Sequence, residues 1–288
     1  MVQLRFLGVR KTELETALKG REIKGEDGRD VMGSRDQIDT GTQKQINEVR
    51  GFLRACDSLT VLTGAGVSAE SGIPTFRDAQ TGLWARYDPM ELATPEAFAR
   101  DPALVSRWYD ERRGKCADCR PNPGHLALAQ LQQRFEAAGR RFTLITQNVD
   151  RLHQQAGSRD PVELHGTLWL WRCTSCGEER EEREIPFPDH PPRCACGSIR
   201  RPGVVWFGES LPEAALAAAW QAAESCELFM SLGTSSLVEP AASLARVAAN
   251  AGAKTVEINL KRTPLSTRVD ISIAGATGEL LPQILTET

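Results

Sequence analysis

Short apolar runs alternate with longer stretches of helical spacing along most of the chain. Four runs have the length and apolar content of buried strands: Leu59–Thr63, Phe142–Thr146, Leu228–Leu232 and Thr255–Ile258. Apolar residues three and four positions apart predict helices before and between them: Ile46–Cys56, His125–Ala138, Glu213–Ala223 and Pro240–Asn250. Short, continuously apolar strands that alternate with helices are typical of a parallel sheet with helices on both faces, so we expect an α/β fold.

Polar or glycine residues follow each predicted strand. They are Gly64–Ala69, Gln147–Asp150, Gly233–Ser235 and Asn259. Parallel strands bring their carboxyl ends to one edge of the sheet, and α/β proteins bind ligands beyond that edge. The functional site is therefore expected there.

The first of these clusters, Gly64-Ala65-Gly66-Val67-Ser68-Ala69, matches the G-x-G-x-x-G/A pattern of a dinucleotide-binding turn. Its glycines permit a tight turn and a close approach of backbone N–H groups to a pyrophosphate. Dehydrogenases with this turn have a second strand that ends in an acidic residue about 20 residues later. Here a loop broken by Gly72 and Pro74 follows instead. The sequence thus predicts a Rossmann-like sheet that binds a dinucleotide, and it disfavours hydride transfer.

Two cysteine pairs lie in a segment that interrupts the strand–helix alternation, at about residues 167–201. The pairs are Cys173-x2-Cys176 and Cys194-x-Cys196, and the segment is also rich in proline. Eight cysteines in 288 residues are too few for a disulfide scaffold. The spacing predicts a small inserted zinc-ribbon module around one structural Zn²⁺, although the second pair is tighter than usual. The alternative is four free buried thiols.

A third pair, Cys116-x2-Cys119, lies between helical stretches with no second pair nearby, so we do not expect it to bind metal. His165 follows the strand-like run Val162–Leu164 and precedes a glycine. Because the usual pKa of histidine lies near neutrality, His165 is a candidate general base, although a lone histidine is as often structural.

Composition narrows the function class. The formal net charge is −3, which disfavours direct nucleic-acid binding through a global basic field. No run of 18 apolar residues predicts a membrane span, and we expect a cytoplasmic protein. Residues 1–44 have the composition of a poorly ordered charged extension, so we expect one catalytic domain at 45–288 with the inserted module.

Six separate motifs, in order, resemble the sirtuins, which are NAD-dependent protein-lysine deacylases. The matching stretches are Gly64–Ser68 with Gly72–Arg77, Pro121–His125, Thr146–His153, Leu164–Gly166 with the cysteine pairs, Arg201–Glu209, and Gly233–Ser235. The resemblance covers about residues 45–285. It implies that NAD is consumed as a co-substrate, which is consistent with the missing acidic strand.

The resemblance also implies roles for individual residues. His165, Asn148 and Asp150 would be catalytic. The residues expected to bind NAD are Gly64, Ala65, Gly66, Ser68, Ala69, Thr75, Phe76, Arg77, Gln147, Asn148, Asp150, Gly233, Thr234, Ser235, Asn259, Leu260, Lys261 and Ala276. A strand over Val204–Glu209 would pair with the substrate backbone through Val205 and Phe207. The products would be free lysine, nicotinamide and 2′-O-acyl-ADP-ribose.

The acyl specificity is suggested by Tyr109 and Arg112, which lie three residues apart in a predicted helix over 102–113. A hydroxyl and a guanidinium on one helix face suit a carboxylate. This pair resembles the acyl-pocket signature of class III sirtuins, which implies removal of succinyl as well as acetyl groups from protein substrates. Spacing alone favours a surface arginine beside Glu111 and Arg113, and it is the resemblance that favours the acyl pocket.

Two other functions stay open at this stage. The same NAD cleavage ends on a protein acceptor in a mono-ADP-ribosyltransferase, and a zinc-ribbon scaffold with an inactive nucleotide fold would have no chemistry. The simultaneous presence of Gln147, Asn148, Asp150 and His165 counts against the scaffold. We expect acylated-lysine proteins as partners and a monomer or weak oligomer.

Overall fold

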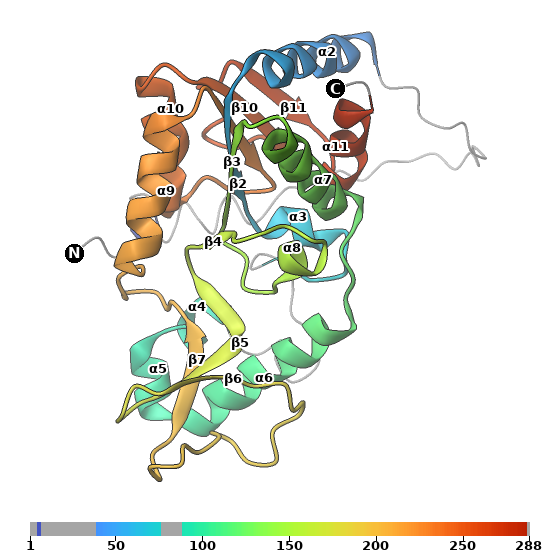
Figure 1. Ribbon diagram of the computed structural model, residues 1–288. Helices are drawn as coiled ribbons and strands as arrows, with labels where there is room; N and C mark the ends of the chain where they lie inside the picture. The colour runs from blue at the N-terminus through green and yellow to red at the C-terminus, as the bar shows by residue number, and fades with distance from the viewer. Residues whose placement is uncertain (1–4, 7–38, 76–87, 287–288) are drawn as a thin grey trace, which may run out of the picture.

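The structure is a computed structural model that describes residues 5–6, 39–75 and 88–286. It has two lobes (Figure 1): a larger one built on a parallel sheet and a smaller one built on an antiparallel sheet. The expected NAD-binding residues Phe76 and Arg77 lie outside the described residues. In the described part of the chain, no helix is long and apolar enough to cross a membrane.

The larger sheet has six strands in the order β11-β10-β8-β2-β3-β4, and every neighbouring pair is parallel. The strands are β2 (Ser58–Thr63), β3 (Arg141–Thr146), β4 (Val162–Glu163), β8 (Leu228–Leu232), β10 (Lys254–Asn259) and β11 (Ile271–Ala274). The chain begins in the middle at β2, builds outward to β4, and then returns to build the other half from β8. This is the strand order of a doubly wound nucleotide-binding sheet, so the predicted Rossmann-like fold is confirmed.

Helices cover both faces of this sheet (Figure 1). One face packs against α2 (Thr40–Ala55), α7 (Pro123–Ala137) and α11 (Thr277–Leu285). The other face packs against α9 (Glu213–Ser225) and α10 (Leu244–Asn250). Successive residues of β2 alternate between the two cores, with Val61 in the first and Leu62 in the second. Burial on both faces explains why β2 and β8 read as continuous apolar runs.

The first domain boundary differs from the sequence expectation. Helix α2 begins at Thr40, so the expected boundary at residue 45 falls inside this helix. Asp39 caps it, because its Oδ1 accepts hydrogen bonds from the N–H groups of Gly41 and Thr42 at 2.8 and 3.1 Å. In the expected extension, β1 (Arg5–Phe6) pairs with β9 (Val238–Glu239).

The smaller lobe contains an antiparallel sheet in the order β6-β5-β7. Its strands are β5 (Gly166–Cys173), β6 (Glu179–Glu181) and β7 (Arg200–Val204). The expected strand over Val204–Glu209 is wrong in its bounds, since β7 ends at Val204. The inserted module does not stand alone: α5 (Pro95–Arg100) and α6 (Pro102–Asp118) share a core with it, centred on Trp108, Trp171 and Trp206. The remaining short helices are α3 (Ala65–Ala69), α4 (Pro89–Leu92), α8 (Leu152–Gln155) and η2 (Ala241–Ser243).

Candidate functional site

The glycine-rich turn after β2 touches the loop after β8 at the carboxyl edge of the larger sheet. The N–H group of Gly66 donates to the carbonyl oxygen of Gly233 at 2.8 Å. A Cβ atom on Gly66 would lie 2.7 Å from that oxygen, and Gly233 has a φ of +58°. These two positions therefore need glycine, because the backbones meet without room for a side chain. The contact lies where the strand order reverses, which is the usual ligand position in such sheets.

Three of the expected site residues, Ser68, Asn148 and Asp150, form one buried hydrogen-bonded cluster beside this turn. The hydroxyl of Ser68 donates to Oδ2 of Asp150 at 2.7 Å and accepts from Nδ2 of Asn148 at 3.1 Å. Asn148 Nδ2 also lies 3.1 Å from the carbonyl oxygen of Gly64, which ties the cluster to the turn. Burial raises the pKa of Asp150, whereas the hydrogen bonds from Leu152 and Ser68 oppose this rise. The cluster holds a carboxylate and an amide in a fixed orientation at the edge of the sheet.

Two buried histidines, with ring centroids 4.8 Å apart, lie near this cluster, although sequence reasoning gave them no role, and one of them contacts it. Nε2 of His125 lies 3.4 Å from the Ser68 hydroxyl, and its Nδ1 accepts the N–H of Asn122 at 3.3 Å. Nε2 of His153 lies 2.9 Å from the Thr63 hydroxyl. Burial lowers the pKa of His125 to about 4 and that of His153 to about 3, so both rings are neutral at pH 7. The sequence did contain a signal for His125, because the stretch Pro121–His125 is one of the six matching motifs, but that match assigned no role to the histidine.

His165 has the geometry of a general base. Its Nδ1–H donates to the carbonyl oxygen of Gln147 at 3.1 Å, which leaves the lone pair on Nε2. Nε2 is buried and makes no hydrogen bond within the described part of the chain. Burial lowers the pKa of His165 to about 4, against the opposing effect of the Gln147 carbonyl. The ring is therefore neutral at physiological pH and can accept a proton at Nε2.

Gln147 joins this histidine to the loop after β8. Its side-chain amide donates to the hydroxyl of Thr234 at 3.0 Å, in the loop after β8. Farther along the edge, the N–H of Gly275 donates to the carbonyl oxygen of Asn259 at 3.1 Å. Several of the expected NAD-binding residues follow strands of the larger sheet: Ser235 lies after β8, Leu260 and Lys261 follow Asn259, the last residue of β10, and Ala276 lies after β11. Ala65 and Ala69 belong to α3, and Thr75 follows that helix.

The expected acyl residues are on α6, and one of them, Tyr109, is hydrogen-bonded to Trp206. Indole Nε1 of Trp206 donates to the hydroxyl oxygen of Tyr109 at 3.0 Å. Because indole only donates, the hydrogen of the Tyr109 hydroxyl stays available to another acceptor. Burial raises the pKa of Tyr109 to about 12, so it keeps that hydrogen. The guanidinium of Arg112 lies over the Trp108 ring at 4.8 Å, and its positive charge opposes the rise that burial causes in the pKa values of Tyr109 and Asp150.

The N–H groups of Val205 and Phe207, the residues expected to pair with the substrate backbone, have partners within the chain. The N–H of Val205 donates to the carbonyl oxygen of His165, and the N–H of Phe207 donates to that of Ala93, both at 2.9 Å. These two N–H groups are therefore already bonded within the chain. A substrate strand beside them would have to use their carbonyl oxygens instead.

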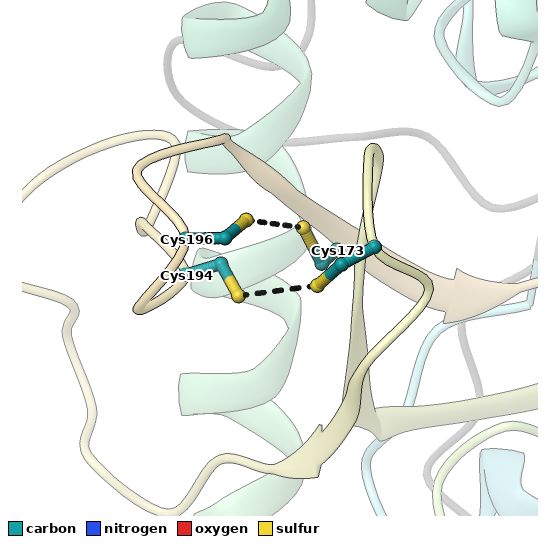
Figure 2. A group of neighbouring side chains, drawn as sticks. Cys173, Cys194 and Cys196 are labelled. Atoms are coloured by element: carbon teal, nitrogen blue, oxygen red, sulfur yellow. Dashed lines mark hydrogen bonds between the residues drawn. The ribbon is translucent and has the colours of Figure 1, made fainter.

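The four cysteines of the inserted module converge on one point (Figure 2). Their Sγ atoms all lie within 4.8 Å of one another, with Cys173 and Cys196 at 3.5 Å and Cys176 and Cys194 at 3.7 Å. Tetrahedral zinc with Zn–S bonds of about 2.3 Å requires sulfur atoms about 3.8 Å apart. The residues therefore fit one Zn²⁺ with four thiolates, and no coordination position remains for a substrate. A zinc ion held by these four residues would be structural.

The other cysteine pair behaves differently. Burial raises the pKa of Cys116 to about 12, which disfavours the thiolate that a metal needs. The Sγ of Cys119 donates to the carbonyl oxygen of Lys115 at 3.2 Å. Among the described residues, the group around Cys173 is the one whose ligand atoms converge on a possible metal position.

Comparison with known proteins gives consistent matches over most of the chain. The Sir2 family model matches residues 64–240. An NAD-dependent protein deacylase of Methylococcus capsulatus is 51% identical over 249 residues, which cover 83% of this chain and 95% of that protein. A crystal structure of a Sir2 homologue–NAD complex has a TM-score of 0.78 at 45% identity, covering 84% of this chain and 93% of that one. A structure of Sir2 bound to acetylated peptide has a TM-score of 0.74 at 31% identity, covering 84% and 98% of the two chains.

Proposed function

The chain belongs to the Sir2 family, and on this premise we propose that it is an NAD-dependent protein-lysine deacylase that removes acetyl and succinyl groups. The observation that carries the proposal is the hydrogen bond from His165 Nδ1 to the carbonyl of Gln147, the residue before Asn148, which leaves Nε2 as a neutral base. The named relatives and neighbours, a deacylase, an NAD complex and an acetylated-peptide complex, support the same chemistry.

In the proposed reaction the acyl-lysine carbonyl oxygen attacks C1′ of the nicotinamide ribose, and nicotinamide leaves. Asn148 and Asp150 hold the nicotinamide end of NAD, because their buried polar groups have one fixed orientation. His165 then accepts a proton at Nε2 from a ribose hydroxyl, whose oxygen attacks the acyl carbon. Water completes the release of lysine and 2′-O-acyl-ADP-ribose.

The acyl range rests on Tyr109 and Arg112. A succinyl group ends in a carboxylate, and a guanidinium with a neutral phenol hydroxyl offers charge-assisted hydrogen bonds to it. An acetyl group has nothing to gain from either partner. Arg112→Met should therefore lower kcat/KM for a succinyl-lysine peptide by about 10²-fold or more and spare the matched acetyl peptide.

One assay tests both levels of this proposal. Matched acetyl- and succinyl-lysine peptides are incubated with adenosine-labelled NAD, and free lysine peptide is followed by mass spectrometry. Label in soluble acyl-ADP-ribose supports deacylation, whereas label on protein would show ADP-ribosyl transfer. Glu111→Gln, a neighbouring exposed change on the same helix, is the control for Arg112→Met. Equal losses on both peptides would remove Arg112 from the acyl site.

The proposed partners are proteins with acylated lysines, and the catalytic unit is the part of the chain from α2 to α11. The zinc residues Cys173, Cys176, Cys194 and Cys196 hold the inserted module together. Metal binding there supplies folding free energy to a segment with a small core of its own.

A further inference from the structure

Two buried charged residues of α6 have no part in the chemistry above. Asp110 is 2% exposed and Arg113 is fully buried, and Arg113 Nη1 lies 2.8 Å from Asp110 Oδ1. Burying an ion pair is costly unless other hydrogen bonds satisfy its remaining atoms. The further partners of the pair therefore indicate what it holds in place.

The hydrogen bonds that leave α6 from this pair reach one segment of the zinc module, residues 182–190. Arg113 Nη2 donates to the carbonyl oxygens of Glu182 and Glu184 at 2.7 and 3.0 Å. Asp110 Oδ2 accepts from the N–H of Phe187 at 2.7 Å and from Nε2 of His190 at 2.9 Å. The segment runs on into Cys194 and Cys196, so the pair joins α6 to the chain that carries half of the zinc ligands.

The anchor residues are the immediate neighbours of the acyl residues. Asp110 follows Tyr109, and Arg113 follows Arg112, so each anchor is turned by about 100° around the helix from an acyl residue. The same helix thus presents one face to the zinc module and the adjacent face to the acyl site. Fixing Asp110 and Arg113 fixes the rotation of α6 and with it the direction of Tyr109 and Arg112.

We infer that Asp110, Arg113 and His190 are positioning residues through which the zinc module sets the preference for carboxylated acyl groups. This inference rests on the proposed deacylase function and goes beyond it by assigning selectivity to residues outside the acyl pocket. A guanidinium must be placed within about 1 Å of its productive position to bind a carboxylate well. An acetyl group makes no such demand, so a small rotation of α6 affects the two substrates unequally.

The test compares His190→Ala with His190→Gln, because the side chain of His190 is 18% exposed and its replacement leaves the buried pair in place. Kinetics are measured on matched succinyl- and acetyl-lysine peptides, together with zinc content and thermal unfolding. His190→Ala should raise KM for the succinyl peptide about tenfold and leave kcat and the acetyl KM within about twofold. His190→Gln should recover most of the loss, since its amide N–H can donate to Asp110. Asp110→Asn should act in the same direction, and Glu111→Gln is the control.

Equal changes on both peptides, or an unchanged succinyl KM in His190→Ala, would overturn the inference. If Asp110→Asn fails to fold, the two His190 variants decide. Arg112→Met is measured in parallel, to separate the proposed acyl role of Arg112 from the positioning role of Asp110, Arg113 and His190. Loss of succinyl activity in Arg112→Met alone would leave the deacylase proposal standing and refute the positioning role. A wild-type protein without succinyl activity would refute the acyl range and the inference with it.

Discussion

The protonation state of His165 leads to the sharpest quantitative prediction. Neutral imidazole is the active form of a base, and burial lowers the pKa of His165 to about 4. With that value about 1% of the ring is protonated at pH 6, whereas a histidine with the usual pKa of about 6.5 would be about three-quarters protonated. The rate of deacylation at pH 6 therefore depends strongly on whether burial lowers the pKa of His165.

The assay is kcat/KM for an acetyl-lysine peptide between pH 5 and 8 at saturating NAD, because this parameter reports the ionisation of the enzyme before the peptide binds. We expect less than about a tenth of the activity to be lost between pH 8 and pH 6 on account of His165. Intrinsic fluorescence at each pH verifies that the protein stays folded. A fall to about a quarter at pH 6, with a midpoint near 6.5, would refute the buried, neutral ring.

Two substitutions at the same position separate the base from the hydrogen bond. His165→Asn keeps an N–H that can reach the Gln147 carbonyl, whereas His165→Ala removes it. Both should lose about 10²-fold to 10⁴-fold in deacylation, the usual contribution of a general base. Deacylation by either variant within about threefold of wild type would exclude His165 as the base.

Three further predictions concern the framework of the site. Cys176→Ser should lower the zinc content from one per chain and destabilise the smaller lobe, as measured by atomic absorption and thermal unfolding, whereas Cys119→Ser should retain full zinc. The pKa values of His125 and His153 are lower in the folded state than in the unfolded chain, so the unfolded state takes up protons first as the pH falls. The stabilisation from the two neutral rings is therefore complete above about pH 6.5 and is lost toward pH 3–4. Between pH 7 and 5 the free energy of unfolding should fall by about 2 kcal/mol per ring. Urea unfolding at both pH values checks this, and a His153→Leu variant with an unchanged pH dependence would contradict it. Gly233→Ala should lower the free energy of unfolding by about 2–4 kcal/mol, because the Cβ of the alanine would lie 2.4 Å from the Val67 nitrogen. A variant as stable as wild type in urea unfolding would contradict this, because the backbone would then have moved apart at no cost.

The parallel sheet was predictable because its central strands are buried on both faces. A run with four apolar residues in five, such as Leu228–Leu232, is unfavourable at a surface, and the polar residues after it mark the carboxyl edge. The zinc site was predictable for a similar reason, since four thiols in two close pairs have few other uses in one short segment. Both signals are local in the sequence.

The end of the sheet was not predictable from such patterns. Strand β11 has four residues, and only two of them are buried. Helix α11 contains Gly278 and Pro282, which are poor helix formers, and its stability comes from packing of Leu281 and Ile284 against the core. The helix propensity of these residues therefore disfavours α11, although tertiary contacts stabilise it.

Arg113 shows the same limit at the level of a single side chain. In the run Tyr109–Arg113 two acidic residues are followed by two basic ones with no apolar pattern, which is typical of an exposed helix face. The structure buries Arg113 completely, because its partners Glu182 and Glu184 arrive about seventy residues later in the chain. The spacing within a helix cannot show which face a distant segment will cover.

The position of His165 shows why the two lobes must act together. It lies between β4 of the larger sheet and β5 of the smaller one, so its ring bonds to Gln147 in the first lobe while its carbonyl oxygen accepts from Val205 beside the second. The next residue, Gly166, has a φ of +70°, and a Cβ there would lie 2.0 Å from the carbonyl oxygen of Gly203. This turn therefore needs glycine where β5 pairs with β7. A zinc ion held by Cys173 at the end of β5 and by Cys194 and Cys196 before β7 would support that pairing, so a metal without an open coordination position would still help to hold the base in place.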